Sequence, residues 1–172
     1  MENGEHARVG PLVAAGALLG IGLGGFVDGI LLHQLLQWHH MLTARLPATD
    51  LVNLKINMVW DGLFHAFTWL TIVVGLALLW RATGRPDVVR STRAFAGSLV
   101  LGWGVFNVVE GMIDHELLQI HHVHPGDDQL SWDVAFLMLG AALIAAGWTA
   151  ITRDDHAAGA RSLRGPYRPA RP

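Results

Sequence analysis

Two stretches of this chain place nearly the same polar residues inside long apolar runs. Residues 28–40 read DGILLHQLLQWHH, and residues 110–122, which follow 82 positions later, read EGMIDHELLQIHH. Both stretches keep an acid, a glutamine and three histidines at matching positions. Ionisable groups are expensive in hydrocarbon, so a helix that faced only lipid would have no reason to repeat them. The pattern predicts helices that turn these side chains toward a shared, functional interior.

The composition is typical of a membrane protein. The chain is 52% hydrophobic and 15% charged, with a mean hydropathy of +0.37. Four apolar runs approach the roughly 20 residues that cross about 30 Å of hydrocarbon. They cover residues 9–37, 59–80, 94–119 and 132–151. We therefore expect an all-α, integral membrane four-helix bundle with the lipid bilayer as its main partner and no nucleic-acid partner.

The two copies predict two tandem helix hairpins of the same orientation, related by a pseudo-two-fold axis along the membrane normal. The membrane domain would span 1–153, with repeat one at 9–80 and repeat two at 92–151, and a disordered cytoplasmic tail at 154–172. Arginines gather in 81–93 and in the tail, whereas 120–131 has no Lys or Arg. By the positive-inside rule, both termini of this multi-pass protein face the cytoplasm across the cell's inner (cytoplasmic) membrane. The histidine clusters would face the outside or the periplasm.

The polar residues of both copies are typical of a metal site. Acids and imidazoles that converge inside a helical bundle are the usual way in which bundles hold metals. The chain has no cysteine, so the ligands would be nitrogen and oxygen. Helix geometry puts the repeated acids about 7.5 Å deeper than the histidines five residues later. The expected ligands are His33, His115, Asp28, Glu110, Asp61, His65, His40 and His122.

A second set of residues is expected at the mouth of the site or behind the ligands. On an ideal helix, His33, Gln37 and His40 form one stripe, and His39 points toward a different face. Asp133 begins a helix, where capping the helix and binding a metal are equally good interpretations. The set is His39, His121, His124, Gln37, Gln119, Asp114 and Asp133.

Several functions fit this pattern. The spacing does not choose among copper, iron and zinc, and it leaves open whether the protein is an enzyme. His33 and His115 could instead be the axial ligands of a haem b in an electron carrier or oxidoreductase, although the acids would then have no role. A cation or proton transporter, for which four helices would require a homodimer, is a third interpretation. The fourth is a structural network of His–acid pairs.

The phrases GGFVDGILLHQLLQWHHML at 24–42 and WDGLFHAF at 60–67 carry a family resemblance. Over about 20–151, the chain resembles a family of bacterial four-helix membrane proteins classified as a domain of unknown function, with the signature GFxDGIxLHQxLQWHHM. The resemblance implies the fold and the histidine-rich outer face. It also implies an association with metal handling, metal-delivery proteins and respiratory oxidase assembly, but it assigns no catalytic residue.

Overall fold

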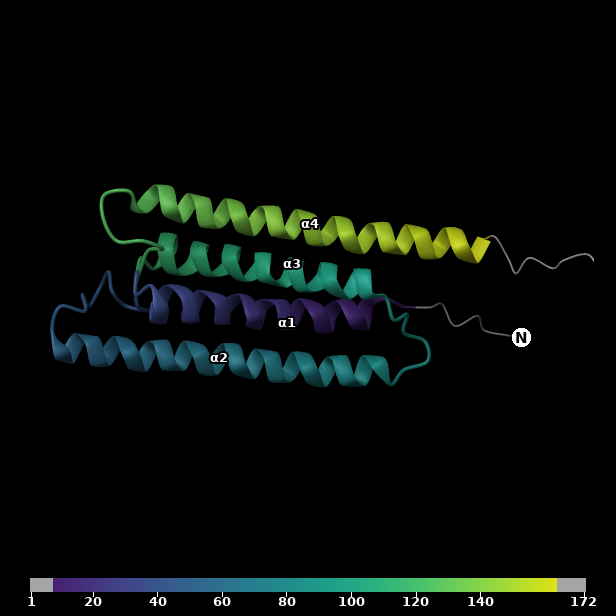
Figure 1. Cartoon of the computed structure of the whole chain (residues 1–172), viewed down its shortest axis with the longest axis horizontal. Coiled ribbons are helices and arrows are strands. Elements are labelled where there is room, and N and C mark those ends of the chain that lie inside the picture. Colours follow the sequence, from purple (N-terminus) through teal and green to yellow (C-terminus); the bar gives the residue numbers. More distant parts are fainter. Residues whose placement is uncertain (1–7, 164–172) are drawn as a thin grey trace, which may run out of the picture.

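The computed structural model describes residues 8–163, with side chains up to Arg153. Within this range the chain forms four long helices and no strand (Figure 1). Two of the four spans each end in a π-helical segment. The elements are α1 (Gly10–Asp28), η1 (Gly29–Leu35), α2 (Leu51–Thr83), α3 (Thr92–Glu110), η2 (Gly111–Leu117) and α4 (Gln129–Leu163). The expected all-α membrane fold is confirmed.

Several helix boundaries differ from those predicted from hydropathy, most clearly those of α2 and α4. Helix α2 begins at Leu51, eight residues before the predicted apolar run, because the Asp50 carboxylate accepts hydrogen bonds from the N–H groups of Val52 and Asn53. Helix α4 continues to Leu163 and so includes the first part of the expected tail; residues 164–172 of that tail lie outside the described range. Hydropathy marks where a helix enters hydrocarbon, whereas capping marks where it begins.

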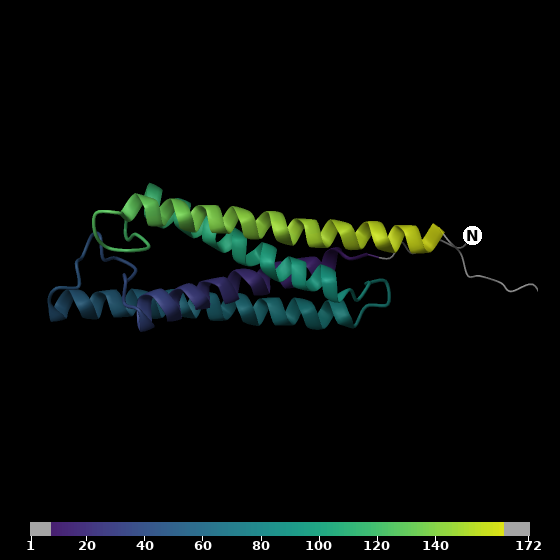
Figure 2. The same cartoon turned by 45° about the horizontal axis from the view of Figure 1, so that its top comes forward.

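The helices follow the spatial order α2, α1, α3, α4, with α1 and α3 in the centre (Figures 1 and 2). All four are long and apolar enough to cross a membrane. About half of each central span is buried, 50% for Gly10–Leu35 and 44% for Thr92–Leu117, against 11% and 17% for the outer spans. The outer helices therefore turn most of their apolar surface outward, as lipid-facing helices do.

Glycines allow the two central helices to cross closely. A Cβ on Gly20 would overlap the carbonyl oxygen of Leu99, and a Cβ on Gly102 would overlap that of Ala17. No other residue fits at this crossing without moving a backbone, which is how small residues let membrane helices approach each other. The crossing fixes η1 and η2 relative to each other at one end of the protein.

Candidate metal centre

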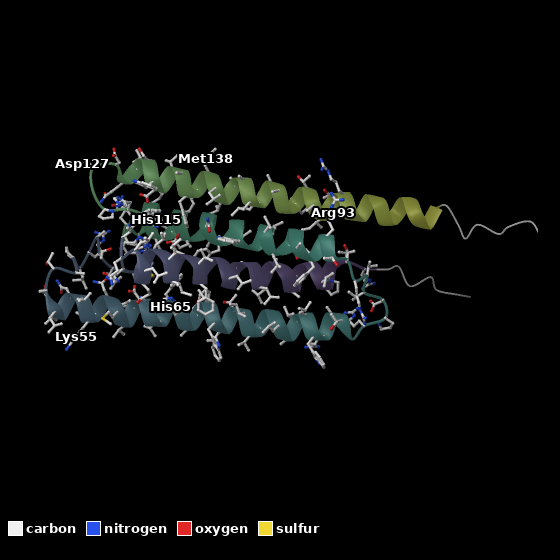
Figure 3. The ribbon with its side chains drawn as sticks, in the orientation of Figure 1. Lys55, His65, Arg93, His115, Asp127 and Met138 are labelled. Carbon is white, nitrogen blue, oxygen red and sulfur yellow. The ribbon has the colours of Figure 1, made fainter. Side chains whose placement is uncertain are left out.

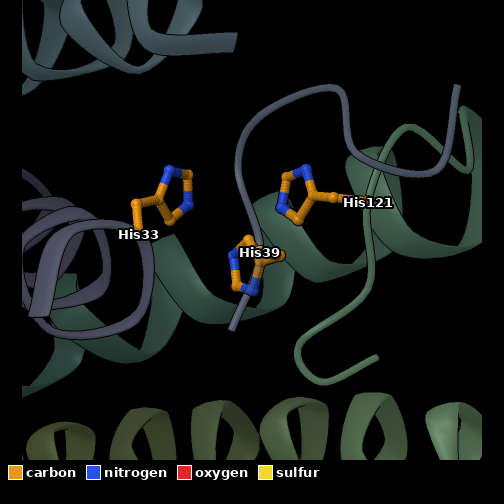
Figure 4. Close-up of side chains that lie close together, drawn as sticks. All are labelled: His33, His39 and His121. Atoms are coloured by element: carbon orange, nitrogen blue, oxygen red, sulfur yellow. The ribbon is translucent and has the colours of Figure 1, made fainter. Parts of the chain in front are cut away.

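Four histidines pack together where η1 and η2 end. His33 and His115 come from the π-helical segments, and His39 and His121 come from the loops that follow them (Figures 3 and 4). None is more than 4% exposed. The His39 and His121 rings stack with centroids 4.6 Å apart, and each meets the histidine of its own segment edge-on, at 4.5 Å for His33 and 4.9 Å for His115.

The π-helical winding brings each repeated acid beside its histidine. In a π-helix the backbone bond joins residues five apart, so residues five apart lie one above the other. Asp28 Oδ2 consequently lies 3.3 Å from His33 Nε2, and Glu110 Oε1 lies 3.1 Å from His115 Nε2. The α-helical geometry assumed from the sequence was wrong here, because it placed the acids a turn and a half deeper than the histidines.

A sharp turn after each π-helical segment sends the next histidine inward. Gln37 and Gln119 have φ values of 50° and 49° and are the two non-glycine residues with positive φ in the described chain. Both side chains are exposed. Because the helix has already ended, Gln37 and His40 do not continue the stripe predicted from His33. His39 and His121, predicted to face another direction, lie instead at the centre of the cluster.

Two aspartates from the outer helices hold the Nδ1 side of the cluster. Asp61 of α2 accepts from His33 Nδ1 at 3.0 Å, from His40 Nδ1 at 2.6 Å and from the Met41 N–H at 2.9 Å. Asp133, expected at the mouth of the site or behind the ligands, makes the matching contacts behind the histidines of the second half.

Asp133 of α4 makes the corresponding contacts in the second half. It lies 3.2 Å from His115 Nδ1 and accepts from His122 Nδ1 at 2.6 Å and from the Val123 N–H at 3.0 Å. His40 and His122, predicted as ligands, therefore sit behind the cluster, on the outer oxygen of each aspartate.

The two central histidines are oriented by the opposite half of the chain. His39 Nδ1 donates to the carbonyl of Val123 at 2.9 Å, and His121 Nδ1 donates to the carbonyl of Met41 at 3.1 Å. Met41 and Val123 occupy matching positions after the two histidine pairs. The sequence could not predict these contacts, because every residue has a backbone carbonyl.

Engaging Nδ1 determines what Nε2 can do. A carbonyl or carboxylate oxygen accepts, so Nδ1 carries the hydrogen and the neutral ring keeps its lone pair on Nε2. Among the described residues, the Nε2 atoms of His33, His39 and His115 have no hydrogen bond of good geometry, and neither do Asp28 Oδ2 and Glu110 Oε2. His115 Nδ1, 3.2 Å from Asp133, also lacks a hydrogen bond of good geometry, so its tautomer is less firmly fixed than those of the other three. Buried polar atoms are rarely left this way in proteins.

The cluster has the dimensions of a metal site. Two overlapping groups place one potential ligand atom per residue within 4.8 Å of one another. The first contains His33, His39 and His121, and the second contains Glu110, His115 and His121. In both halves the second ring nitrogen faces a carboxylate or a carbonyl, which is the arrangement that fixes histidines as metal ligands.

The loop histidine at the centre is held without charge. Burial, together with repulsion from the neighbouring His121 and His33 when these are protonated, lowers the pKa of His39 from 6.5 to about 2. Its imidazole is therefore neutral at physiological pH, as a metal ligand must be.

Several predicted residues lie outside the cluster. His65 Nδ1 donates to the carbonyl of Asp61 in its own helix, and its ring faces Phe64 and Phe26 (Figure 3). His124 packs between Trp38 and Trp132, with ring centroids 4.8 and 5.3 Å away, respectively.

Asp114 lines an apolar cavity of about 330 Å³ on the α2 side, together with Glu110, Phe67 and Ile113. A second cavity, of about 280 Å³, reaches Asp28 from the α4 side between Val27 and Leu139. Each of the two acids that approach the histidines from the membrane interior thus borders one apolar cavity.

The packing does not provide a place for a haem. The His33 ring contacts both His39 and His121, and so does the His115 ring, at centroid distances of 4.5 to 6.4 Å. A porphyrin ligated by His33 and His115 would have to displace the two rings that lie between them.

A family model described as "Predicted membrane protein (DUF2243)" matches residues 15–154 of the chain. The match covers most of the chain and all four spans, so the chain belongs to this family. No curated protein and no solved structure matches it.

Proposed function

We propose that this DUF2243 membrane protein binds copper, iron or zinc in the outer half of its helices, through four histidines and two carboxylates. The four are His33, His39, His115 and His121, and the two carboxylates are Asp28 and Glu110. We call these six residues the histidine core. The observation that carries the proposal is the set of buried Nε2 and carboxylate atoms without hydrogen-bond partners, facing one another.

Electrostatics supports a cation at this place. Asp28, Asp61, Glu110 and Asp133 are each at most 7% exposed, and among the described residues none pairs with a lysine or an arginine. A buried carboxylate costs several kcal/mol unless it is paired or bound to a metal. A metal ion would supply the missing positive charge.

The ligand types limit which metal can bind. Imidazole and carboxylate without thiolate suit zinc, iron and Cu(II) better than Cu(I), which prefers sulfur. The contact of His121 Nε2 with Glu110 Oε1 at 2.9 Å requires a shared proton in the metal-free protein. A bound ion would replace that proton, since metal binding releases protons from its ligands.

The two-hairpin arrangement belongs to the same proposal. The contacts of His33 with Asp28 and Asp61 have counterparts in those of His115 with Glu110 and Asp133. A pseudo-two-fold axis that relates the two halves and passes between His39 and His121 accounts for this correspondence and for the reciprocal carbonyl contacts.

The orientation in the membrane also remains part of the proposal. Arg93 lies at the opposite end of the helices from His115 (Figure 3). With the arginine-rich connection 84–91 in the cytoplasm, the histidine core faces the outside or the periplasm. Metal delivery to a respiratory oxidase and homodimer formation stay predictions.

The test is metal content. The protein would be purified in detergent with an affinity tag that contains no histidine, and its metals measured by mass spectrometry and a visible spectrum. We expect a stoichiometric transition metal, no Soret band, and loss of the metal in His39→Ala. His65→Ala is the matched control, because His65 lies in the same part of the membrane but bonds only to its own helix, and this variant should keep its metal. Metal-free wild type after reconstitution with copper, iron and zinc would overturn the proposal.

A further inference from the structure

The histidine core contains more ligands than one ion needs. Its six side chains supply four Nε2 atoms and two carboxylates, and metal sites that keep open positions use about three protein ligands per ion. The two potential ligand groups both include His121. His121 Nδ1 is engaged by the Met41 carbonyl, so this ring has one nitrogen for a metal and cannot serve two ions.

The two ions do not compete for His121 if each half of the chain supplies the ligands of one ion. Glu110, His115 and His121 form one complete group within the second half. In the first half, His33 and His39 belong to the other group, whose third member is His121. Asp28 belongs to neither group, but its Oδ2 lies 3.3 Å from His33 Nε2, so it is the acid of the first half that can replace His121 beside His33. Each half thus supplies one acid and two imidazoles, and no residue is used twice.

The charges of the surrounding acids point to the same number of ions. Four buried carboxylates contribute four negative charges when ionised, two from the histidine core and two from Asp61 and Asp133 behind it. No lysine or arginine offsets them within the described side chains. With His40 and His122, which lie 2.6 Å from Asp61 and Asp133, in their neutral form, one divalent ion would leave two charges unbalanced, whereas two divalent ions balance all four.

We propose that the centre holds two divalent metal ions, one bound by Asp28, His33 and His39 and the other by Glu110, His115 and His121. This inference rests on the proposed function and adds the number of ions and the ligands of each. Because each ion has three protein ligands, each keeps an open coordination position, as the ions of dinuclear catalytic centres do.

The supporting shell differs between the two kinds of ligand. His33 and His115 each lie beside an aspartate and a phenylalanine: the His33 ring stacks on Phe64, and the His115 ring lies tilted against Phe136, both with centroids 5.6 Å apart. His39 and His121 are each held by a carbonyl from the other half. Removing His33 or His115 therefore affects one ion directly and leaves the reciprocal carbonyl contacts in place.

The experiment loads the purified protein with Cu(II), removes loosely bound copper by gel filtration, and measures copper per chain together with the electron paramagnetic resonance spectrum. Wild type should bind two coppers per chain with a dipolar-broadened spectrum and a half-field signal. His33→Ala and His115→Ala should each bind one copper with a resolved mononuclear spectrum, and the double variant should bind none. Asp28→Asn and Glu110→Gln serve as milder variants, because each keeps the size of the side chain and removes its charge. Each is expected to weaken the binding of one ion.

The outcomes separate the two proposals. One copper per wild-type chain, lost in both single variants, would overturn the two-ion centre and keep metal binding. No copper in folded wild type would overturn the two-ion copper centre, and failure of iron and zinc to bind as well would overturn metal binding. His65→Ala should keep two coppers, and loss of an ion in this control would show that the count reports general damage rather than the ligands. Gel filtration also shows whether each variant is folded. Only variants that elute at the wild-type volume are compared for copper content, so a histidine that is needed for folding is not mistaken for a ligand.

Discussion

Replacing Asp61 by asparagine tests whether the aspartates of the outer helices tune the metal rather than bind it. The carboxylate accepts from His33 Nδ1, His40 Nδ1 and the Met41 N–H at 3.0, 2.6 and 2.9 Å. Asparagine keeps the size but offers one acceptor oxygen, and its amide turns a donor toward one of the two ring N–H groups. His33 would lose its charged partner and its fixed tautomer.

The expected size of the effect follows from this geometry. Loss of a partner that orients a metal-binding histidine typically lowers metal affinity by about 10- to 100-fold, or about 1.4 to 2.7 kcal/mol. Asp133→Asn should have a similar effect through His115. The effect should be confined to affinity, with the same number of ions at saturation, because neither aspartate is a ligand.

The assay is competition between the protein and a chelator of known affinity, followed through the visible bands of bound Co(II). Asp87→Asn is the control: this partly exposed carboxylate pairs with Arg85 at the other end of the helices, at 2.6 Å, and its loss should leave Co(II) affinity unchanged. Unchanged affinity in Asp61→Asn would refute the orienting role. Complete loss of one ion at saturating metal would instead make Asp61 a ligand.

Three further outcomes are expected. Gly102→Leu should disrupt the crossing of α1 and α3, where a side chain meets the Ala17 carbonyl, and lower the thermal stability of the detergent-solubilised protein; Gly62→Leu, with open space around it, should not. Asn57→Leu should cost about 1 to 3 kcal/mol, measured by denaturant titration, because the buried Asn57 amide accepts from the Leu42 N–H at 2.9 Å and donates to the Leu46 carbonyl at 2.8 Å. In chelator-treated protein, the pKa of His39 is lowered to about 2, so below pH 6.5 only the unfolded state takes up a proton at this residue. As pH falls, the free energy of unfolding should therefore decrease by up to about 1.4 kcal/mol per pH unit more than in His39→Asn. An equal pH dependence of the free energy of unfolding in both proteins would contradict this.

The sequence predicted the four spans and the polar residues that gather at one end, because hydropathy and repeated ionisable groups are written directly in residue types. It did not predict which histidines are central. His39 and His121 were placed on another face because the helices were extended to Gln37 and Gln119. The structure ends them earlier in π-helical turns and continues through positive φ values at two glutamines, a residue type that gives no turn signal.

The role of the outer helices was also only partly visible. Asp61 was predicted as a ligand together with His65, since a four-residue spacing puts both on one face of α2. The carboxylate does reach the histidines, but the imidazole packs against Gly29 beside Phe64. Whether a side chain on a shared helical face points into a cluster or along its rim depends on how deeply two helices pack, and this depth is set by contacts far apart in sequence.

The reciprocal contacts of His39 with the Val123 carbonyl and of His121 with the Met41 carbonyl tie the two halves of the chain together at the candidate metal centre. A fragment that ended in the 84–91 connection would retain Asp28, His33 and His39 but would lose the acceptor that sets the tautomer of His39. The remaining half of the chain, supplied as a second fragment, would have to bind beside the first to recover a complete centre.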